Sequence, residues 1–189
     1  ILKLTFVLNF TIEKRSPIII WDADTIILKK ILFFEKKNSI CHGTTSEFHK
    51  AYYLTNKALL NNLPKYFISS LCQFSSITLS EADFLIKKLI KIKPKNKNIG
   101  EWITNVIFKA ITSAHKEYNG SMFSEYELIG QSNLIFKKNK QKLISGLREE
   151  LNGKLTFTQK IITKILGYSY IAYEHERSDI LSKNMLKRN

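Results

Sequence analysis

The sequence predicts an α/β domain with a mostly parallel sheet. A short, wholly apolar run, Ile18–Trp21, lies between Pro17 and Asp22, which is typical of a strand buried on both faces. Apolar side chains recur at helical spacing over residues 100–118. Strand-like and helix-like segments also alternate along the chain, which is the pattern of parallel sheets with crossover helices.

The composition limits the class of protein. The chain has 189 residues, of which 44% are hydrophobic, and this fits one compact domain or most of one. Its 7 Gly, 3 Pro and 2 Cys exclude a collagen-like repeat, a disordered chain and a disulfide scaffold. No run of about 18 apolar residues is present, which is the length a membrane-spanning helix requires.

The first half of the chain predicts helices and strands in alternation. Leu4, Leu8 and Ile12 lie at helical spacing, with Phe6 and Phe10 nearby, so residues 1–13 are expected to form a buried helix that ends before Pro17. After this strand we expect a second strand at 39–43 and one or two strands in 66–79. Between them, a helix is expected at 45–61, and its inward residues are Phe48, Ala51, Tyr52, Ala58 and Leu59. A further helix begins at the capping-box spacing of Ser80 and Asp83, and one of its faces contains Ala82, Leu85, Ile86 and Leu89.

The second half contains the clearest periodicity. The helix expected at 100–118 has its apolar residues at helical spacing, namely Ile103, Val106, Ile107, Ala110, Ile111 and Ala114. The remaining expectations are a helical turn at 124–129, a strand at 131–137, helices at 143–151 and 157–166, the latter ended by Gly167, and a strand at 168–173. Residues 1–176 therefore form the predicted domain, and residues 177–189 form a polar tail.

The formal net charge is +14, but arginine contributes little of it. Only four of the 30 basic residues are Arg, whereas nucleic-acid readers depend on Arg for bidentate contacts. We therefore expect no nucleic-acid partner, although a basic nucleic-acid-binding protein remains the less favoured alternative. The net positive charge also suits a phosphate-bearing substrate or an anionic membrane face. The lysine run at 91–97 is interpreted as a solvated loop, and contact with an anionic membrane is the alternative.

An acidic pair follows the apolar strand. Asp22 and Asp24 are two of only four Asp residues in the chain, and they lie where ligands of open α/β sheets collect. Residues two apart in an extended segment project to the same side, so the carboxylates repel unless a cation or hydrogen bonds stabilise them. Mg²⁺ or Mn²⁺ with a bound diphosphate satisfies this requirement. The alternative is a pair of loop carboxylates that cap a turn.

Four segments resemble one protein family. IIIWDADTIIL, from Ile18 to Leu28, resembles the DxD strand of GT-A glycosyltransferases and, more narrowly, that of a bacterial, poorly characterised family of GT-A-like proteins. ILKL at the start of the chain resembles the helix before that strand, and EFHKAYY at 47–53 resembles a segment after it. FSEYELIG at 123–130 is the most specific of the four. Residues 75–78 read SSIT where the family often has Gln-His-Met, so acceptor contacts there are expected to differ.

The resemblance implies a GT-A-like mixed sheet flanked by helices, and a metal-dependent glycosyltransferase. Such an enzyme moves a sugar from a nucleoside diphosphate sugar to a hydroxyl on a glycan or lipid-linked acceptor, in surface polysaccharide or lipopolysaccharide synthesis. Asp24 would bind Mn²⁺ or Mg²⁺ directly, and Asp22 would bind ribose, or the metal through water. The family's first βαβ unit is missing here, so we expect the native protein to extend upstream. A cytoplasmic location with peripheral contact at the inner membrane face is implied.

Three further residues are candidates for the site. Glu125 is a candidate general base on the acceptor hydroxyl, with a helix-capping role as the alternative. Glu127 is interpreted as the partner of Ser124 in a capping box. His175 is a candidate third metal ligand or a solvated side chain, and Lys3 is a candidate phosphate ligand. A catalytically inactive GT-A-like binding module is the main alternative function.

Overall fold

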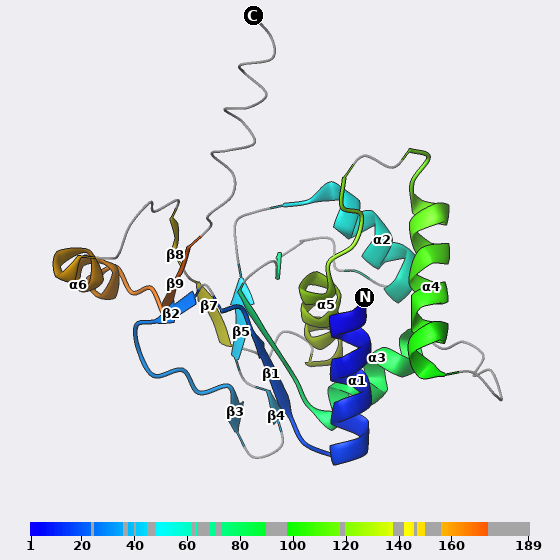
Figure 1. Ribbon diagram of the computed structural model, residues 1–189, viewed down its shortest axis with the longest axis horizontal. Helices are drawn as coiled ribbons and strands as arrows, with labels where there is room; N and C mark the ends of the chain where they lie inside the picture. The colour runs from blue at the N-terminus through cyan, green and yellow to red at the C-terminus, as the bar shows by residue number, and fades with distance from the viewer. Residues whose placement is uncertain are drawn as a thin grey trace, which may run out of the picture.

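The structure is a computed structural model of the chain. It describes residues 1–23, 25–35, 38–39, 41–44, 48–61, 63, 69–70, 73–89, 98–117, 120–137, 142–145, 147–149 and 156–173. These residues form a mixed α/β arrangement, as predicted. Five helices gather on one side of the strands, and a sixth lies on the other side (Figure 1). None of the helices in the described ranges is long and apolar enough to cross a membrane.

The five gathered helices share one apolar core. They are α1 (Leu2–Lys14), α2 (Lys50–Leu60), α3 (Leu79–Leu89), α4 (Ile99–Ala114) and α5 (Glu125–Lys137). In α1 the buried positions are Leu4, Val7, Leu8 and Thr11, which is one face of a helix. Phe6 points to solvent with 64% of its surface exposed. The predicted first helix is therefore confirmed, but Val7 and Thr11 rather than Ile12 complete its buried face.

Helix α4 confirms the strongest periodicity in the sequence. Ile103, Ile107, Ala110 and Ile111 are buried, whereas Val106 and Ala114 of the predicted set are partly buried. The Asn98 side chain caps the helix by accepting a hydrogen bond from the Gly100 N–H at 2.8 Å. The helix ends at Ala114, before the predicted residue 118. His115 leaves the helix in an extended conformation, and its Nε2 lies 2.9 Å from Thr55 Oγ1 of α2.

The capping box of α3 uses different residues from those expected. The Thr78 N–H donates to Glu81 Oε2 at 2.7 Å, and the Glu81 N–H contacts Thr78 Oγ1 at 3.4 Å. The prediction of Ser80 and Asp83 as the box was wrong, because the helix begins at Leu79. Of its predicted face, Ala82, Leu85 and Leu89 are buried and Ile86 is partly buried.

In α2 the predicted inward face was only partly right. Thr55, Asn56, Leu59 and Leu60 are buried, whereas Phe48 precedes the helix and is 55% exposed. The helix begins at Lys50, and its buried face turns toward α4 and α5. Polar Thr55 and Asn56 therefore occupy core positions that the apolar pattern could not identify.

The strand before Asp22 has the predicted bounds but a different environment. Strand β1 (Ile18–Trp21) pairs antiparallel with β6 (Phe74–Ile77), with Ile18 opposite Ile77 and Trp21 opposite Phe74. Ile18 and Ile20 pack against the helical core, whereas Ile19 on the other face is 39% exposed. The prediction of a strand covered on both faces was wrong, because burial alternates along the strand.

The remaining strands form small sheets. In one, β2 (Thr25–Ile27) pairs antiparallel with β9 (Tyr170–Tyr173), which pairs parallel with β8 (Leu147–Glu149). Strand β5 (Cys41–Thr44) pairs parallel with β7 (Lys142–Ser145), and β3 (Phe34–Glu35) pairs antiparallel with β4 (Asn38–Ser39). The prediction of a mostly parallel sheet was wrong, since parallel pairs are the minority among the described strands.

Two segments take the opposite secondary structure to the one expected. The predicted strand at 131–137 is the second half of α5, and the predicted helix at 143–151 contains β7 and β8. In α5 the polar residues Gln131, Ser132 and Asn133 are buried, and Asn133 Nδ2 donates to the carbonyl of Ser76 in β6 at 2.9 Å. In β7 the pairing with β5 outweighs the local helical spacing.

Four aromatic rings join the β1–β6 pair to the sheet of β2, β9 and β8. Trp21 stacks on Phe74 with ring centroids 5.3 Å apart, and Phe33 meets Phe74 edge-on at 5.3 Å. Tyr170 of β9 also meets Phe74 edge-on, at 5.6 Å. This cluster holds the last residue of β1 in place, directly before Asp22.

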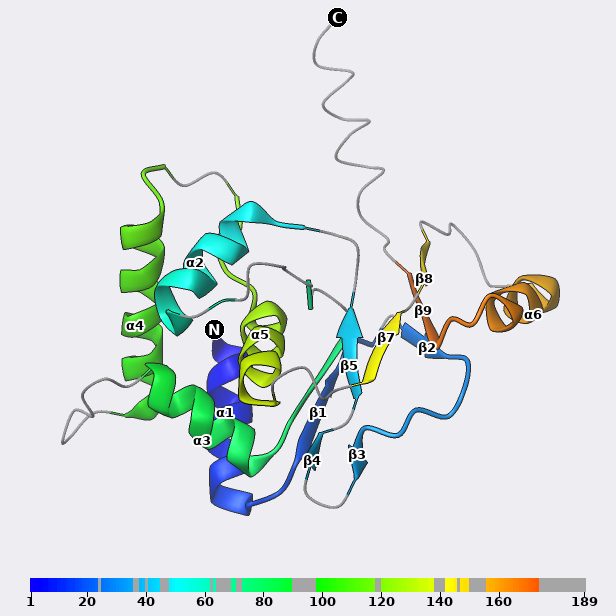
Figure 2. The same cartoon turned by 180° about the vertical axis from the view of Figure 1, so that it is seen from behind.

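Helix α6 (Phe157–Ile165) lies apart from the other helices, at the far side of the strands (Figure 2). It ends as predicted at Gly167, which has a φ of 84°. The Gly167 N–H donates to the Lys164 carbonyl at 3.0 Å, and the Tyr168 N–H donates to the Thr163 carbonyl at 3.2 Å. These two bonds form a Schellman motif, which requires a left-handed residue and so favours glycine.

Candidate functional site

The backbone of Asp22 is fixed at the carboxyl end of β1. Its N–H donates to the carbonyl of Gln73 at 2.8 Å, which continues the β1–β6 ladder by one residue. The neighbouring Trp21 is held in the aromatic cluster. The side chain of Asp22 remains about one-third exposed, with 34% of its surface accessible. It is therefore a carboxylate on a rigid support that solvent and ligands can reach.

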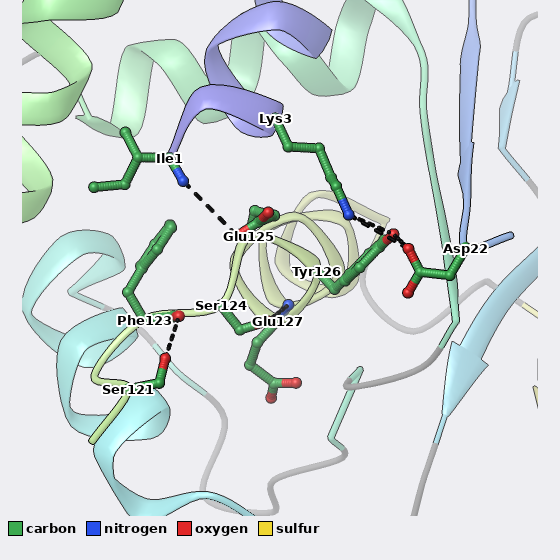
Figure 3. A network of polar contacts seen from close by, with 9 residues as sticks. All are labelled: Ile1, Lys3, Asp22, Ser121, Phe123, Ser124, Glu125, Tyr126 and Glu127. Atoms are coloured by element: carbon green, nitrogen blue, oxygen red, sulfur yellow. Dashed lines mark hydrogen bonds and ion pairs between the residues drawn. The ribbon is translucent and has the colours of Figure 1, made fainter. Parts of the chain in front are cut away.

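Two side chains from distant parts of the chain converge on this carboxylate (Figure 3). Lys3 Nζ, from α1, lies 3.3 Å from Asp22 Oδ1 and donates to the Tyr126 hydroxyl at 3.1 Å. The Tyr126 hydroxyl, from α5, donates a hydrogen bond to the same Asp22 oxygen. The Lys3 ammonium also lies 4.6 Å from the centroid of the Tyr126 ring, a distance that permits a cation–π contact.

The helices and strands that carry these residues pack against one another. Helix α1 contacts α3 and α4, and α5 contacts both α3 and β6. The bond from Asn133 to the Ser76 carbonyl ties α5 to the strand beside β1. The positions of Lys3, Asp22 and Tyr126 are therefore set by the core rather than by flexible loops.

An ammonium, a phenol and a carboxylate at the molecular surface have a definite chemistry. Lys3 has three donors and is 42% exposed, so it can bind a phosphate oxygen while it stays near Asp22. Asp22 offers acceptors for a ribose hydroxyl or for the water shell of a divalent cation. The arrangement therefore suits a ligand that combines phosphate groups with hydroxyls.

The described residues contain no group of three or more His, Cys, Asp and Glu side chains that could enclose a metal. Mg²⁺ and Mn²⁺ commonly bind through one or two carboxylates together with phosphate oxygens and water, so a protein cage is not required. Asp22 fits such a site as an oxygen ligand, because its carboxylate lies at the rim of the fold and is accessible. Asp24 and His175, the other predicted ligands, lie outside the described residues.

The acidic residues beside Tyr126 face other directions. The Glu125 carboxylate lies 3.9 Å from the amino group of Ile1 and is 22% exposed, and it does not point toward Asp22 (Figure 3). Successive helical residues are rotated by about 100°, so of three consecutive side chains only one can meet Asp22. The structure brings Tyr126 to that position.

Glu127 points into the protein on the opposite side of α5 (Figure 3). Its Oε2 accepts hydrogen bonds from the Ser70 N–H at 2.7 Å and from the Ser69 hydroxyl at 3.2 Å, and its Oε1 accepts from Gln131 Nε2 at 3.3 Å. Burial raises the pKa of this carboxyl to about 7, against the lowering effect of these bonds. Only half of the predicted capping box is present: the Glu127 N–H contacts Ser124 Oγ at 3.4 Å, while the carboxylate serves Ser69 and Ser70.

Tyr126 is the site residue that reasoning from the sequence missed. It lies between the two glutamates of FSEYELIG, and the acid–base chemistry of carboxylates made these glutamates the predicted candidates instead. The signal was present, because a tyrosine in the first turn of a helix has a hydroxyl that reaches beyond its own helix. The lysine run at 91–97 and the tail at 177–189 lie outside the described residues.

Comparisons with known proteins assign the chain to no family. A scan of family models finds no match to the sequence. Searches of the curated proteins and of the solved structures also find no match. The function is therefore inferred from the residues and their geometry.

Proposed function

We propose that this protein is a metal-dependent glycosyltransferase that moves a sugar from a nucleoside diphosphate sugar to a hydroxyl acceptor. One observation carries the proposal: Lys3, Asp22 and Tyr126 meet at a single point. These residues belong to three of the four segments on which the resemblance to GT-A-like proteins rests, and they are far apart in sequence. If these segments form one functional site, they are expected to meet in space, as Lys3, Asp22 and Tyr126 do.

The donor side of the site is assigned to three residues. Lys3 binds the diphosphate and offsets its negative charge. Asp22 accepts a hydrogen bond from the ribose or from metal-bound water, and Asp24 is the direct ligand of Mn²⁺ or Mg²⁺. The metal, when bound, stabilises the negative charge of the leaving diphosphate. Tyr126 holds the Asp22 carboxylate and the Lys3 ammonium in a fixed relation.

The acceptor side is assigned to Glu125. In the proposed step the acceptor hydroxyl oxygen forms a bond to the anomeric carbon and loses its proton to the Glu125 carboxylate. The bond from the anomeric carbon to the diphosphate oxygen breaks, and the diphosphate leaves with the electron pair. Glu125 precedes Tyr126 in α5, but its carboxylate faces the amino group of Ile1 rather than Asp22, so the proposed acceptor approaches on that side of the helix.

Calorimetry with Mn²⁺ and a panel of nucleoside diphosphates tests the donor site. We expect binding that depends on Mn²⁺ and that Asp22→Asn and Asp24→Ala each weaken by at least about tenfold, since each removes a charged ligand. Asp83→Asn is the matched control, because Asp83 is an exposed carboxylate on α3, and it should bind like the unmodified chain. Nucleotide binding that ignores both site variants would contradict the donor-site assignment.

A second measurement separates transfer from binding alone. Release of nucleoside diphosphate from a sugar donor in the presence of acceptor should depend on Mn²⁺ and fall in Glu125→Gln. If the nucleotide binds with the expected dependence on Asp24 but no sugar is released or transferred, the protein is an inactive binding module and the enzymatic part of the proposal is wrong. Salt-sensitive binding of DNA or RNA that Asp24→Ala leaves unchanged would favour a nucleic-acid role instead.

A further inference from the structure

Helix α6 exposes its apolar face and buries Thr163. The large apolar side chains of this segment are all exposed: Phe157 by 78%, Ile161 by 41%, Ile162 by 50%, Ile165 by 77% and Leu166 by 65%. Thr163, by contrast, is only 4% exposed. With a rotation of about 100° per residue, the five apolar positions span about half of the helix surface. A helix on the surface of a globular protein normally has the reverse orientation.

The orientation of α6 is fixed at its carboxyl end. Lys29 Nζ donates to the Gly167 carbonyl at 2.8 Å, and the Schellman motif leads directly into β9, which pairs with β2. Both views show α6 at the edge of the molecule, beyond the strands and away from the other five helices (Figures 1 and 2). The apolar face is therefore held outward at an accessible extremity.

The charge around α6 indicates what covers this face. Residues 151–173 include Lys154, Lys160 and Lys164 and contain no Asp or Glu. Lys164 is exposed beside the apolar face, where its aliphatic stem can lie along a lipid surface while the ammonium reaches the headgroups. The net charge of +14 disfavours burial of this face against a second copy of the same chain and favours an anionic surface.

We propose that α6 is a membrane-docking helix, with its apolar face inserted at the headgroup level of a bilayer that contains anionic phospholipids. An apolar stripe with an exposed lysine, Lys164, along its edge is typical of short interfacial helices. The proposal depends only on the exposure and charge of α6, so its test is independent of the proposed transferase activity.

Vesicle flotation tests the proposal. The chain is mixed with vesicles of phosphatidylcholine alone, or with about 30 mol% phosphatidylglycerol to supply negative charge. We expect binding to the anionic vesicles, weaker binding at high salt, and little binding to the neutral ones. The double substitution Phe157→Ser and Ile165→Ser should reduce the bound fraction by about tenfold or more, because it removes the two most exposed apolar side chains of the helix.

Controls separate insertion from general effects. Phe108→Ser removes an exposed aromatic side chain from α4, which is 55% exposed, and should bind like the unmodified chain. Lys164→Glu should reduce binding several-fold, and mostly at low salt. Phe157 and Ile165 are surface residues, so circular dichroism and thermal unfolding should show the double variant folded.

Three results would overturn the proposal. One is an unmodified chain that stays unbound with anionic vesicles. Another is a double variant that floats as well as the unmodified chain. The third is light scattering that shows a dimer in solution, which the double variant disrupts, without vesicle binding. That last result would assign the apolar face to an interface between copies of this chain.

Discussion

At the scale of single residues, the buried Glu127 carboxyl has a raised pKa. It is 1% exposed, and burial raises its pKa to about 7 from an ordinary value of 4.5. Between these values the folded protein keeps a proton that the unfolded chain releases. The folded state is therefore stabilised at low pH, and this contribution is lost as the pH rises through the window.

Glu127→Gln should remove this pH dependence. Between pH 4.5 and a pH above 7, the unmodified chain should lose about 3 kcal/mol of unfolding free energy relative to the variant, because Gln does not ionise. Urea unfolding at several pH values measures it. Asp83→Asn, at an exposed carboxylate, controls for the lost charge. A difference that stays constant with pH would show that Glu127 ionises normally.

Tyr126 is a positioning residue at the same scale. Tyr126→Phe removes the hydroxyl that donates to Asp22 but keeps the ring beside Lys3. We expect nucleoside diphosphate affinity in the presence of Mn²⁺ to fall by about threefold to tenfold, the value of one hydrogen bond, with little change in melting temperature.

The control for Tyr126 is Tyr52→Phe, which removes a hydroxyl from α2 outside the site. Calorimetry of both variants gives the comparison. Equal affinity in the two would show that the hydroxyl of Tyr126 does not hold the donor site.

At the scale of helices, the contact between α1 and α4 sets the position of Lys3. Gly100, the second residue of α4, lies against Thr5 of α1, and a Cβ added at Gly100 would come within 2.6 Å of Thr5 Cγ2. Thr is branched at Cβ and stiff, so the methyl group cannot move away easily. Glycine is required here because of the close approach of the two helices.

Gly100→Ala should destabilise the protein by about 1–3 kcal/mol, because overpacking outweighs the better helix propensity of alanine. Thr5→Ala removes Cγ2 and leaves the Thr5 Cβ position 3.8 Å away, which is an ordinary contact. In the Thr5→Ala background, Gly100→Ala should therefore cost clearly less, and the one tight contact left for the added Cβ is Asn98 Oδ1 at 3.3 Å. Thermal unfolding of the unmodified chain, the two single variants and the double variant completes the double-mutant cycle. Equal costs in both backgrounds would mean that Thr5 is not the obstacle.

At the scale of the whole molecule, Phe74 connects parts of the fold that come from distant sequence. It is fully buried, and its ring contacts Trp21, Phe33 and Tyr170. These contacts join the strand pair beside the helical core to the sheet that leads to α6. Loss of this ring would weaken the whole molecule rather than one helix or strand.

Phe74→Ala should reduce the free energy of unfolding by about 3–5 kcal/mol, the usual cost of deleting a buried aromatic side chain. Phe108→Ala, at an exposed position on α4, should cost far less. Urea unfolding followed by tryptophan fluorescence measures both, since Trp21 stacks directly on Phe74. Similar losses in the two variants would show that the aromatic cluster adds little.

Features that depend on local periodicity and on turn chemistry can be predicted from the amino-acid sequence. The bounds of β1, the buried faces of α3 and α4, and the end of α6 at Gly167 follow from side-chain spacing and from the conformational freedom of glycine. The sequence also identified Asp22 and Lys3 as candidates. Features that depend on contacts between distant residues are visible only in the folded chain. Strand direction, the helical state of residues 131–137 and the meeting of Tyr126 with Asp22 all require partners far away in the chain. Short-range patterns do not encode those partners, because pairing energies and the burial of polar groups such as Asn133 arise only when the fold is complete.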